Sequence, residues 1–283
     1  MNVQNILQEL DSLFRNQQIA QVEPFLLGHL AVARAAADRS AVLTLLNELM
    51  GFYRGMSRFK EALATGDEAL GLMEAMGYKD SVPYATTLLN VATAYRADGQ
   101  TARAIGLFEE VGRLFVARNV QDAHLIASLY NNLSLAFQEA GEHAKAIACL
   151  DQALPLVASR PGSEVDQAVT CTNRALSRLR LDQLAEARED LAQAVRLFEG
   201  QPVRNSHYGA ALAGLGEVAY REGRLQDAVR FYERALGEIH THYGKNQYYA
   251  VTLESLATVY EALEPARAAE LQAEAQAIQA TLR

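Results

Sequence analysis

Apolar residues recur along the chain with the spacing of paired helices. In YNNLSLAFQEAGEHAKAIACLDQAL (residues 130–154), Leu133 and Phe137 lie four residues apart, and Ile147 and Leu150 follow three apart. Such spacing places apolar side chains on one face of an α-helix. The pattern therefore predicts two helices within this segment.

The same pattern returns every 41 or 42 residues, in three columns of mostly small residues. The first column comprises Ala62, Ala104, Ala146, Ala187, Ala228 and Ala269. The second, seven residues later, comprises Ala69, Val111, Ala153, Ala194 and Ala235 and is broken at Gln276. The third, twelve residues before the first, comprises Met50, Ala92, Ser134, Ala175, Gly216 and Ala257. Because two helices approach closely only where side chains are short, these columns predict where helices pack together.

A fourth column marks the turns inside the repeats: Ser57, Gly99, Gly141, Asp182, Gly223 and Glu264. Glycine suits the left-handed residue that ends a helix, and serine or aspartate can support the same turn through bonds to the backbone. The columns thus predict six helical hairpins. Residues 2–37 look amphipathic but miss the columns.

We expect one domain over residues 1–283. Residues 1–40 would form a degenerate helix pair, residues 41–264 the main repeats, and residues 265–283 the last helix. This helix starts at Pro265 and is rich in Ala, Glu and Gln, as expected of a polar cap over the end of a repeat stack.

Composition and charge narrow the class of protein. With 6 prolines, no tryptophan and few β-branched runs, the composition favours an all-helical protein. The formal net charge of -8, without a concentrated run of Lys and Arg, disfavours nucleic acid as a partner. No apolar stretch of membrane-spanning length occurs, so no membrane association is expected.

Two cysteines, Cys149 and Cys171, are too few for a disulfide framework. We expect two buried free thiols in a cytoplasmic protein. The first residues, MNVQNILQEL, also lack the basic start and apolar core of a secretory signal.

Three segments resemble tetratricopeptide repeats: LLNVATAYRADGQTARAI (88–105), NNLSLAFQEAGEHAKAI (131–147) and LAGLGEVAYREGRLQDAV (212–229). The period of about 42 residues resembles the kinesin light chain variety of this repeat. The resemblance implies an all-α, right-handed α-α superhelix. It also implies that an extended peptide binds the concave surface made by the first helix of each pair.

The resemblance further implies that the residue fourteen places before the alanine column points into this groove. That column reads Glu48, Asn90, Asn132, Asn173, Gly214 and Ser255. An amide can both donate and accept, as a peptide backbone requires, so Asn90, Asn132 and Asn173 are the leading candidates, with Glu48 in the same column. A solvated polar face or a hydrogen bond between repeats would explain the same column.

Four residues earlier stand the short hydroxyls Thr44, Thr86 and Ser128, which would leave room for a ligand. No cation occurs in that column. Arg174 follows Asn173 at a place that is usually apolar. A clamp for the carboxylate of a chaperone tail is therefore not expected.

Other motifs have simpler explanations. HTHYGKNQYY (240–249) offers too few metal ligands, and we expect Tyr248 and Tyr249 to begin a helix and pack on the preceding pair. GLGEVA (214–219) matches a dinucleotide-binding pattern but lies within a predicted helix, where close packing explains its glycines. We identify no catalytic constellation and expect no metal and no cofactor.

The leading hypothesis is a non-catalytic scaffold or adaptor that binds an extended segment of a partner protein in its groove. The alternative is a regulatory receptor that senses a short signalling peptide through a change of superhelical shape. Bacterial peptide-receptor regulators resemble this chain in repeat number. Homo-oligomerisation through the terminal repeats stays open.

Overall fold

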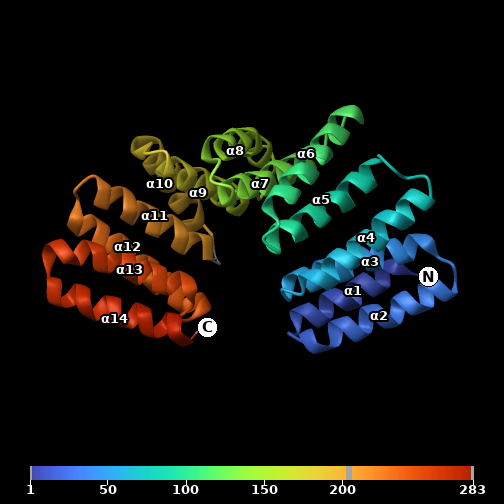
Figure 1. Cartoon of the computed structure of the whole chain (residues 1–283), viewed down its shortest axis with the longest axis horizontal. Coiled ribbons are helices and arrows are strands. Elements are labelled where there is room, and N and C mark those ends of the chain that lie inside the picture. Colours follow the sequence, from blue (N-terminus) through green and yellow to red (C-terminus); the bar gives the residue numbers. More distant parts are fainter. Residues whose placement is uncertain (1, 202–205, 282–283) are drawn as a thin grey trace. The chain divides into compact units, whose positions relative to one another are not determined.

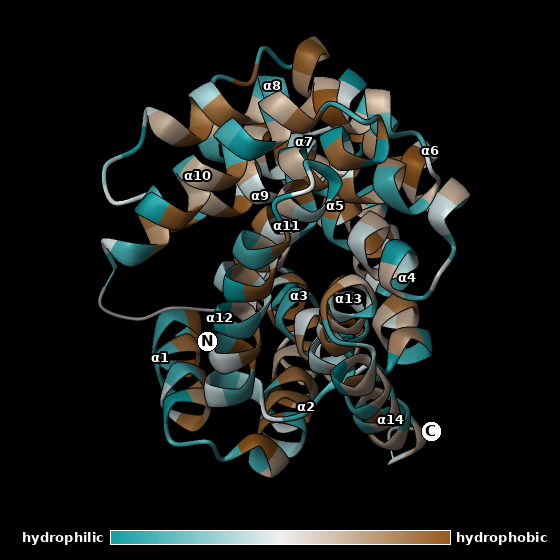
Figure 2. Cartoon of the chain, turned by 90° about the vertical axis from the view of Figure 1, so that its left-hand side faces the viewer, coloured by the Kyte–Doolittle hydropathy of each residue, from teal (hydrophilic) through white to brown (hydrophobic). Residues whose placement is uncertain are grey.

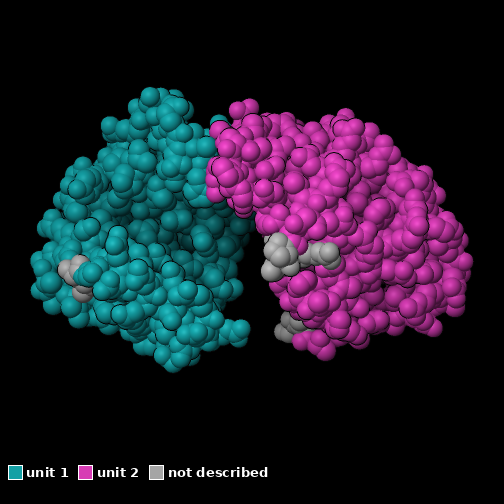
Figure 3. Space-filling model, turned by 180° about the vertical axis from the view of Figure 1, so that it is seen from behind, with its two compact units in different colours: residues 1–140 teal, residues 141–283 magenta. Residues whose placement is uncertain are grey.

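A computed structural model describes residues 2–201 and 206–281, and every regular element in these ranges is an α-helix (Figure 1). The chain divides into two compact units, residues 1–140 and residues 141–283 (Figure 3). Unit 1 contains α1 (Val3–Arg15), α2 (Ile19–Ala35), α3 (Arg39–Gly55), α4 (Phe59–Ala75), α5 (Val82–Ala97), α6 (Thr101–Ala117) and α7 (Ala123–Glu139). Unit 2 contains α8 (His143–Ala158), α9 (Glu164–Arg180), α10 (Leu184–Glu199), α11 (Ser206–Arg221), α12 (Leu225–Tyr243), α13 (Gln247–Leu263) and α14 (Pro265–Thr281).

The predicted all-α repeat class is confirmed. Within unit 1 the hairpins are α1/α2, α3/α4 and α5/α6; within unit 2 they are α9/α10, α11/α12 and α13/α14. Gly141 lies at the boundary, with α7 before it in unit 1 and α8 after it in unit 2. The expectation of one continuous domain stays a prediction. No helix in the described ranges is long and apolar enough to span a membrane.

The predicted turn column is confirmed at five of its six positions. The backbone there is left-handed, with φ of 57° at Ser57, 78° at Gly99, 75° at Gly141, 59° at Asp182 and 74° at Gly223. At Gly99 the N–H donates to the Arg96 carbonyl at 3.0 Å, and the next N–H, of Gln100, donates to the Tyr95 carbonyl at 2.9 Å. This pair of bonds satisfies carbonyls that the end of α5 would otherwise leave without partners.

The last turn differs, and the prediction at Glu264 is wrong. Glu264 has φ of -152° and is the single residue between α13 and α14, whereas three residues connect the helices at the other five turns. The register of α14 shifts by one residue as a result. Ala268 and Ala275 are buried, whereas Ala269 and Gln276 of the predicted columns are exposed. The break in the second column therefore comes from the shortened turn.

Residues 2–37 do form a helix pair, although the small-residue columns are missing. Gln17 takes the left-handed turn position between α1 and α2 with φ of 56°. Val22, five residues later as in the other repeats, takes the alanine position and is fully buried. Leu26 and Leu30 extend the same face of α2 into the core. The larger side chains explain why the pattern of small residues did not reveal this pair.

The small columns pack at the centre of the hairpins. The members in α4, α6, α8, α10 and α12 are fully buried: Ala62, Ala69, Ala104, Val111, Ala146, Ala153, Ala187, Ala194, Ala228 and Ala235. Both cysteines are also buried and free. Burial raises the pKa of the Cys149 and Cys171 thiols to about 11, so both are protonated at neutral pH.

The last helix, α14, buries one face. On α14 only Ala268, Leu271, Ala275 and Ile278 are buried, and they recur at steps of three and four residues. Most of its other positions carry alanine and polar Arg, Glu and Gln side chains. Apolar and polar residues likewise alternate around the other helices (Figure 2). The expectation that α14 caps the stack stays a prediction.

Gly216 tests the close packing of the third column. A Cβ at Gly216 would lie 2.9 Å from the Tyr232 ring of α12, whereas a Cβ at Gly237 would meet nothing within 4 Å. We expect Gly216→Ala to lower the free energy of unfolding by about 1–3 kcal/mol through overpacking. Gly237→Ala should raise it by up to about 1 kcal/mol, because alanine is the better helix former. Urea denaturation measures both, and equal shifts would contradict the packing role of Gly216.

Candidate functional site

The first helices of successive hairpins touch one another. Within unit 1, α3 contacts α5 and α5 contacts α7; within unit 2, α9 contacts α11 and α11 contacts α13. Among the described residues, no second helix makes a comparable contact with the second helix of the next hairpin. A stack whose first helices lie closer together curves with those helices on its inner side. We call the side chains along which α3, α5 and α7 meet the inner strip of unit 1.

Six of the seven predicted binding residues lie on the helices that form this strip: Thr44 and Glu48 on α3, Thr86 and Asn90 on α5, and Ser128 and Asn132 on α7. Steps of four residues keep each pair on one face of its helix. Asn173 lies on α9, in unit 2. The structure therefore brings six of these residues into one unit.

The threonine hydroxyls are used within their own helices. Thr44 Oγ1 donates to the Ser40 carbonyl at 3.2 Å, and Thr86 Oγ1 donates to the Val82 carbonyl at 3.1 Å. The Ser128 hydroxyl has no hydrogen-bond partner in the described part of the chain. Both threonine oxygens keep a free lone pair and can still accept a hydrogen bond from a ligand.

The amide of Asn132 joins two neighbouring repeats. Its Nδ2 donates to the Ser128 carbonyl at 2.9 Å, and its Oδ1 accepts from Thr93 Oγ1 of α5 at 3.5 Å. The single hydrogen of the Thr93 hydroxyl is shared with the Leu89 carbonyl at 2.9 Å, so the contact with Asn132 is the longer and weaker of the two. A polar contact between repeats, which could explain the asparagine column, is therefore present here. In unit 2, Asn173 is only 8% exposed.

The amide of Asn90 has no hydrogen-bond partner among the described residues. The residue that corresponds to Thr93, 42 places earlier in the repeat before, is Gly51. A Cβ at Gly51 would meet no atom within 4 Å, so the space beside it is open. Asn90 is thus a half-buried amide, and the position that corresponds to Thr93, the partner of Asn132, holds a glycine without a side chain.

Glu48 is the third member of this column on the strip. It pairs with no cation among the described residues. Burial, and secondly the negative charge of Asp11 on α1, raise the pKa of the Glu48 carboxyl. Asp11 stands six residues before its turn residue, as Gly51 and Thr93 do. The contact with the preceding first helix is direct at Asn132, and repeat equivalence assigns Glu48 and Asn90 to the same side of their helices.

The sequence analysis missed two arginines of the inner strip. Arg54 and Arg96 stand six residues after Glu48 and Asn90, and they too are 42 residues apart. Arg96 pairs with the carboxylate of Glu139 on α7, whereas Arg54 pairs with no acid among the described residues. Comparing this position between repeats, as was done for the asparagines, would have revealed both.

Arg174, the residue at a usually apolar place, belongs to a buried charge cluster of unit 2. Its Nε and Nη2 contact the two carboxylate oxygens of Asp190 at 2.9 and 2.6 Å. Arg178 adds a contact to Asp190 at 2.7 Å, and Arg174 Nη1 reaches Asp151 of α8 at 2.7 Å. The Asp190 side chain is only 4% exposed. The two cations and two anions balance, and the cluster stands where other repeats bury apolar residues.

The glycines of GLGEVA are packing residues, as expected. They lie within α11. A Cβ at Gly214 would lie 2.8 Å from Leu191 Cδ2 of α10, which excludes larger residues at this close contact. A dinucleotide site requires a strand and a loop at this place, which the helix does not provide.

The segment HTHYGKNQYY is divided between two helices and their connection. As expected, α13 begins with this segment, and Tyr249 packs against the core. Tyr248 is 71% exposed, so the expectation that it packs on the preceding pair is wrong. Within residues 2–201 and 206–281, no group of three potential metal ligands occurs.

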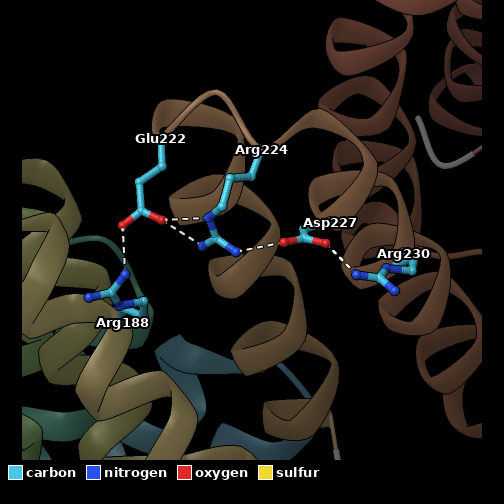
Figure 4. A network of polar contacts seen from close by, with 5 residues as sticks. All are labelled: Arg188, Glu222, Arg224, Asp227 and Arg230. Carbon is cyan, nitrogen blue, oxygen red and sulfur yellow. Dashed lines mark hydrogen bonds and ion pairs between the residues drawn. The ribbon is translucent and has the colours of Figure 1, made fainter.

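An exposed ion-pair network links α10 to the α11/α12 turn (Figure 4). Glu222 accepts from Arg188 at 3.2 Å and from Arg224 at 2.5 Å, and Asp227 lies between Arg224 and Arg230. Hydrogen bonds from Arg230 and Arg224 lower the pKa of Asp227. Exposed pairs contribute little individually, so we assign this network to the packing of neighbouring repeats.

Known proteins share this architecture. Family models of the tetratricopeptide repeat match residues 85–111, 125–200 and 166–237. A search of curated proteins found no match. The apo form of RapI aligns with a TM-score of 0.71 and 13% identity, over 98% of this chain and 76% of RapI.

Two further solved structures are similar. NprR in complex with its cognate peptide NprX aligns with a TM-score of 0.63 and 15% identity, over 96% of this chain and 78% of NprR. Kinesin-light-chain-like repeats from Podosopora anserina align with a TM-score of 0.57 and 20% identity, over 76% of this chain and 99% of that one. At these identities the likeness concerns the fold.

The hairpins, the turn residues and the buried small columns define an all-α repeat protein. The chain belongs to the tetratricopeptide-repeat family. Proteins of this family are protein-interaction scaffolds.

The charge cluster predicts a specific sensitivity of unit 2. Asp190→Asn leaves Arg174 and Arg178 buried without their shared carboxylate, and we expect it to lower the free energy of unfolding by about 3–5 kcal/mol. Asp227→Asn in the exposed network is the control and should change it little. Replacing Arg174, Arg178 and Asp190 together with leucine should be neutral or stabilising. Urea denaturation distinguishes these outcomes, and a small effect of Asp190→Asn would show that the cluster is not a buried electrostatic unit.

Proposed function

We propose that this protein is a non-catalytic interaction protein that binds an extended segment of a partner protein along the inner strip of unit 1. The observation that carries the proposal is the Asn90 amide, which has no partner in the described chain. The position equivalent to Thr93 is Gly51, where a Cβ would meet no atom within 4 Å. The amide atoms of Asn90 are not buried from solvent, so a peptide backbone can replace water there and supply both a donor and an acceptor.

The three asparagines have different roles in this proposal. Asn90 contacts the ligand, whereas Asn132 holds α7 against α5 through Thr93. Asn173 is assigned to packing in unit 2 because it is buried. Thr44, Thr86 and Ser128 flank the peptide with small polar side chains that can accept or donate further hydrogen bonds.

Energy considerations limit what Asn90 can contribute. A net hydrogen bond contributes about 0.5–1.5 kcal/mol, whereas association costs an estimated ~4–15 kcal/mol of lost freedom. Asn90 therefore sets the direction and register of the bound segment, and other groups of the strip and of the ligand must supply most of the affinity.

Similar structures support a peptide ligand and also a second candidate function. NprR was solved with its cognate peptide NprX and aligns over 96% of this chain. A regulatory receptor would bind a short free peptide and change its superhelical shape. Small-angle scattering with and without bound peptide separates the two functions, because an unchanged profile favours the static scaffold.

The remaining expectations concern partners and location. The net charge of -8 supports a protein or peptide partner over nucleic acid. The two buried free cysteines support a cytoplasmic location. Homo-oligomerisation is tested by light scattering of the purified chain.

Two asparagine variants test the proposal. Randomised short peptides, displayed with both ends blocked, are first selected for binding to the wild-type protein. Asn90→Ala should weaken the selected peptides about twofold to tenfold, as the loss of one net hydrogen bond implies, and leave the free energy of unfolding within about 0.5 kcal/mol. Asn132→Ala should lower that free energy by about 1 kcal/mol, because the link to Thr93 is lost.

Fluorescence anisotropy measures the affinities, and urea denaturation measures the stabilities. If every selected peptide binds Asn90→Ala as tightly as the wild type, the proposed position of the site is wrong. If selection yields no peptide that binds the wild type, the binding function itself is wrong.

A further inference from the structure

Two successive interfaces of the inner strip are equivalent in sequence but differ in polar pairing. Between α5 and α7, Thr93 meets Asn132, and Arg96 meets Glu139. Moving each residue back by 42 positions gives the interface between α3 and α5. There the four positions hold Gly51, Asn90, Arg54 and Ala97.

At the α3/α5 interface one member of each pair is present and the other is missing. The amide of Asn90 and the guanidinium of Arg54 remain, while glycine and alanine stand where Thr93 and Glu139 would correspond. Neither remaining polar group has a hydrogen-bond or ion-pair partner among the described residues. Compared with the α5/α7 interface, the missing groups are the hydroxyl that would correspond to Thr93 and the carboxylate that would correspond to Glu139.

Arg54 is not simply a solvated surface cation. It is half-buried, and burial together with the positive charge of Arg96 lowers its pKa. Arg96 engages the Glu139 carboxylate, yet its own Nε is buried without a hydrogen-bond partner. Of these two guanidinium groups, only that of Arg96 contacts a carboxylate, and Arg54 forms no ion pair among the described residues.

Small residues leave room for an occupant beside Arg54. A Cβ at Gly51 or at Gly55 would meet no atom within 4 Å. Glycine inside a helix costs about 0.5–1 kcal/mol relative to alanine, so Gly51 weakens α3 without a packing requirement of its own. Ala97 adds no side chain that reaches beyond its Cβ. The polar groups and the space lie at the same interface.

We infer that the segment bound by the inner strip carries an aspartate or glutamate whose carboxylate binds Arg54, in the place that Glu139 occupies beside Arg96. The inference rests on the proposed function. A carboxylate matches the planar, forked donors of a guanidinium, and the attraction between opposite charges favours an acid over a neutral amide. A segment inside a partner protein has no free terminus, so the side chain is the source of the carboxylate.

The test repeats the selection of end-blocked random peptides on four proteins: wild type, Arg54→Gln, Ala97→Glu and Arg113→Gln. Ala97→Glu gives Arg54 the internal partner that Arg96 already has, so it should fold as the wild type does while closing the site. Arg113, exposed on the second helix α6, is the matched control for loss of one positive charge.

We expect wild type and Arg113→Gln to select peptides with Asp or Glu at one fixed position relative to the residues that depend on Asn90. Arg54→Gln and Ala97→Glu should lose this preference. Selected peptides should bind Arg54→Gln about tenfold to a hundredfold more weakly, the loss expected for a hydrogen bond to a charged group. Changing the peptide acid to its amide should weaken binding to wild type equally and have no further effect on Arg54→Gln, which a double-mutant cycle measures.

Three results would overturn the inference, and they differ in what they leave standing. Selected peptides that depend on Asn90 but show no fixed acid would leave the proposed function intact and remove the role of Arg54. Binders obtained only in a parallel selection of peptides with a free C-terminus would replace the side chain by a chain terminus. An absence of any binding peptide would remove the proposed function together with this inference.

Discussion

The structure depends on the close approach of helices at positions where side chains are small. Ala62 and Ala104, like their counterparts in later repeats, have no exposed surface, and each lies five residues after a left-handed turn residue. The turn fixes where the second helix begins, and the small residues fix how near it lies to its neighbours. Because both constraints repeat, residues 42 apart occupy equivalent places in successive hairpins of unit 1.

Because of this equivalence, the polar contacts of one interface can be compared position by position with those of the next. The interface between α5 and α7 satisfies its polar groups internally, through Asn132 with Thr93 and Arg96 with Glu139. The interface between α3 and α5 has the same backbone arrangement but lacks half of those groups. The difference is chemical rather than architectural, so it concerns what the surface can bind more than how the chain folds.

The fold could be predicted because it depends on local properties of the sequence. The volume of a side chain and the turn preference of glycine act at their own positions, so the columns identified the hairpins. The error at Glu264 arose because that connection is shortened to a single residue, and the buried position moves from Ala269 to Ala268. The helix pair within residues 2–37 escaped the columns because Val22 replaces the usual alanine.

The site was harder to predict, because the state of a polar group depends on a second residue far away in the sequence. Asn90 and Asn132 occupy the same position of the repeat, so the sequence pattern predicts the same role for both. Their difference depends on Gly51 and Thr93, which lie 39 positions before them on the preceding first helix. Arg54 was missed for the same reason. It differs from Arg96 only in that no carboxylate corresponding to Glu139 is present beside it, and this cannot be seen from Arg54 alone.

The buried charges of unit 2 bear on how a repetitive chain assembles correctly. Hairpins of similar shape can stack in a wrong order while the chain folds, because their apolar faces are nearly interchangeable. Within the α9/α10 hairpin, Asp190 is shared by two arginines, and the contact of Arg174 with Asp151 supplies the second carboxylate from α8. Against the apolar face of another repeat, the pairs with Asp190 would persist but Arg174 would lose Asp151, which leaves an excess positive charge in a largely buried place. The cluster thus favours α8 as the neighbour of this hairpin. Apolar contacts between leucines and alanines, which are similar in every repeat, do not distinguish one neighbour from another.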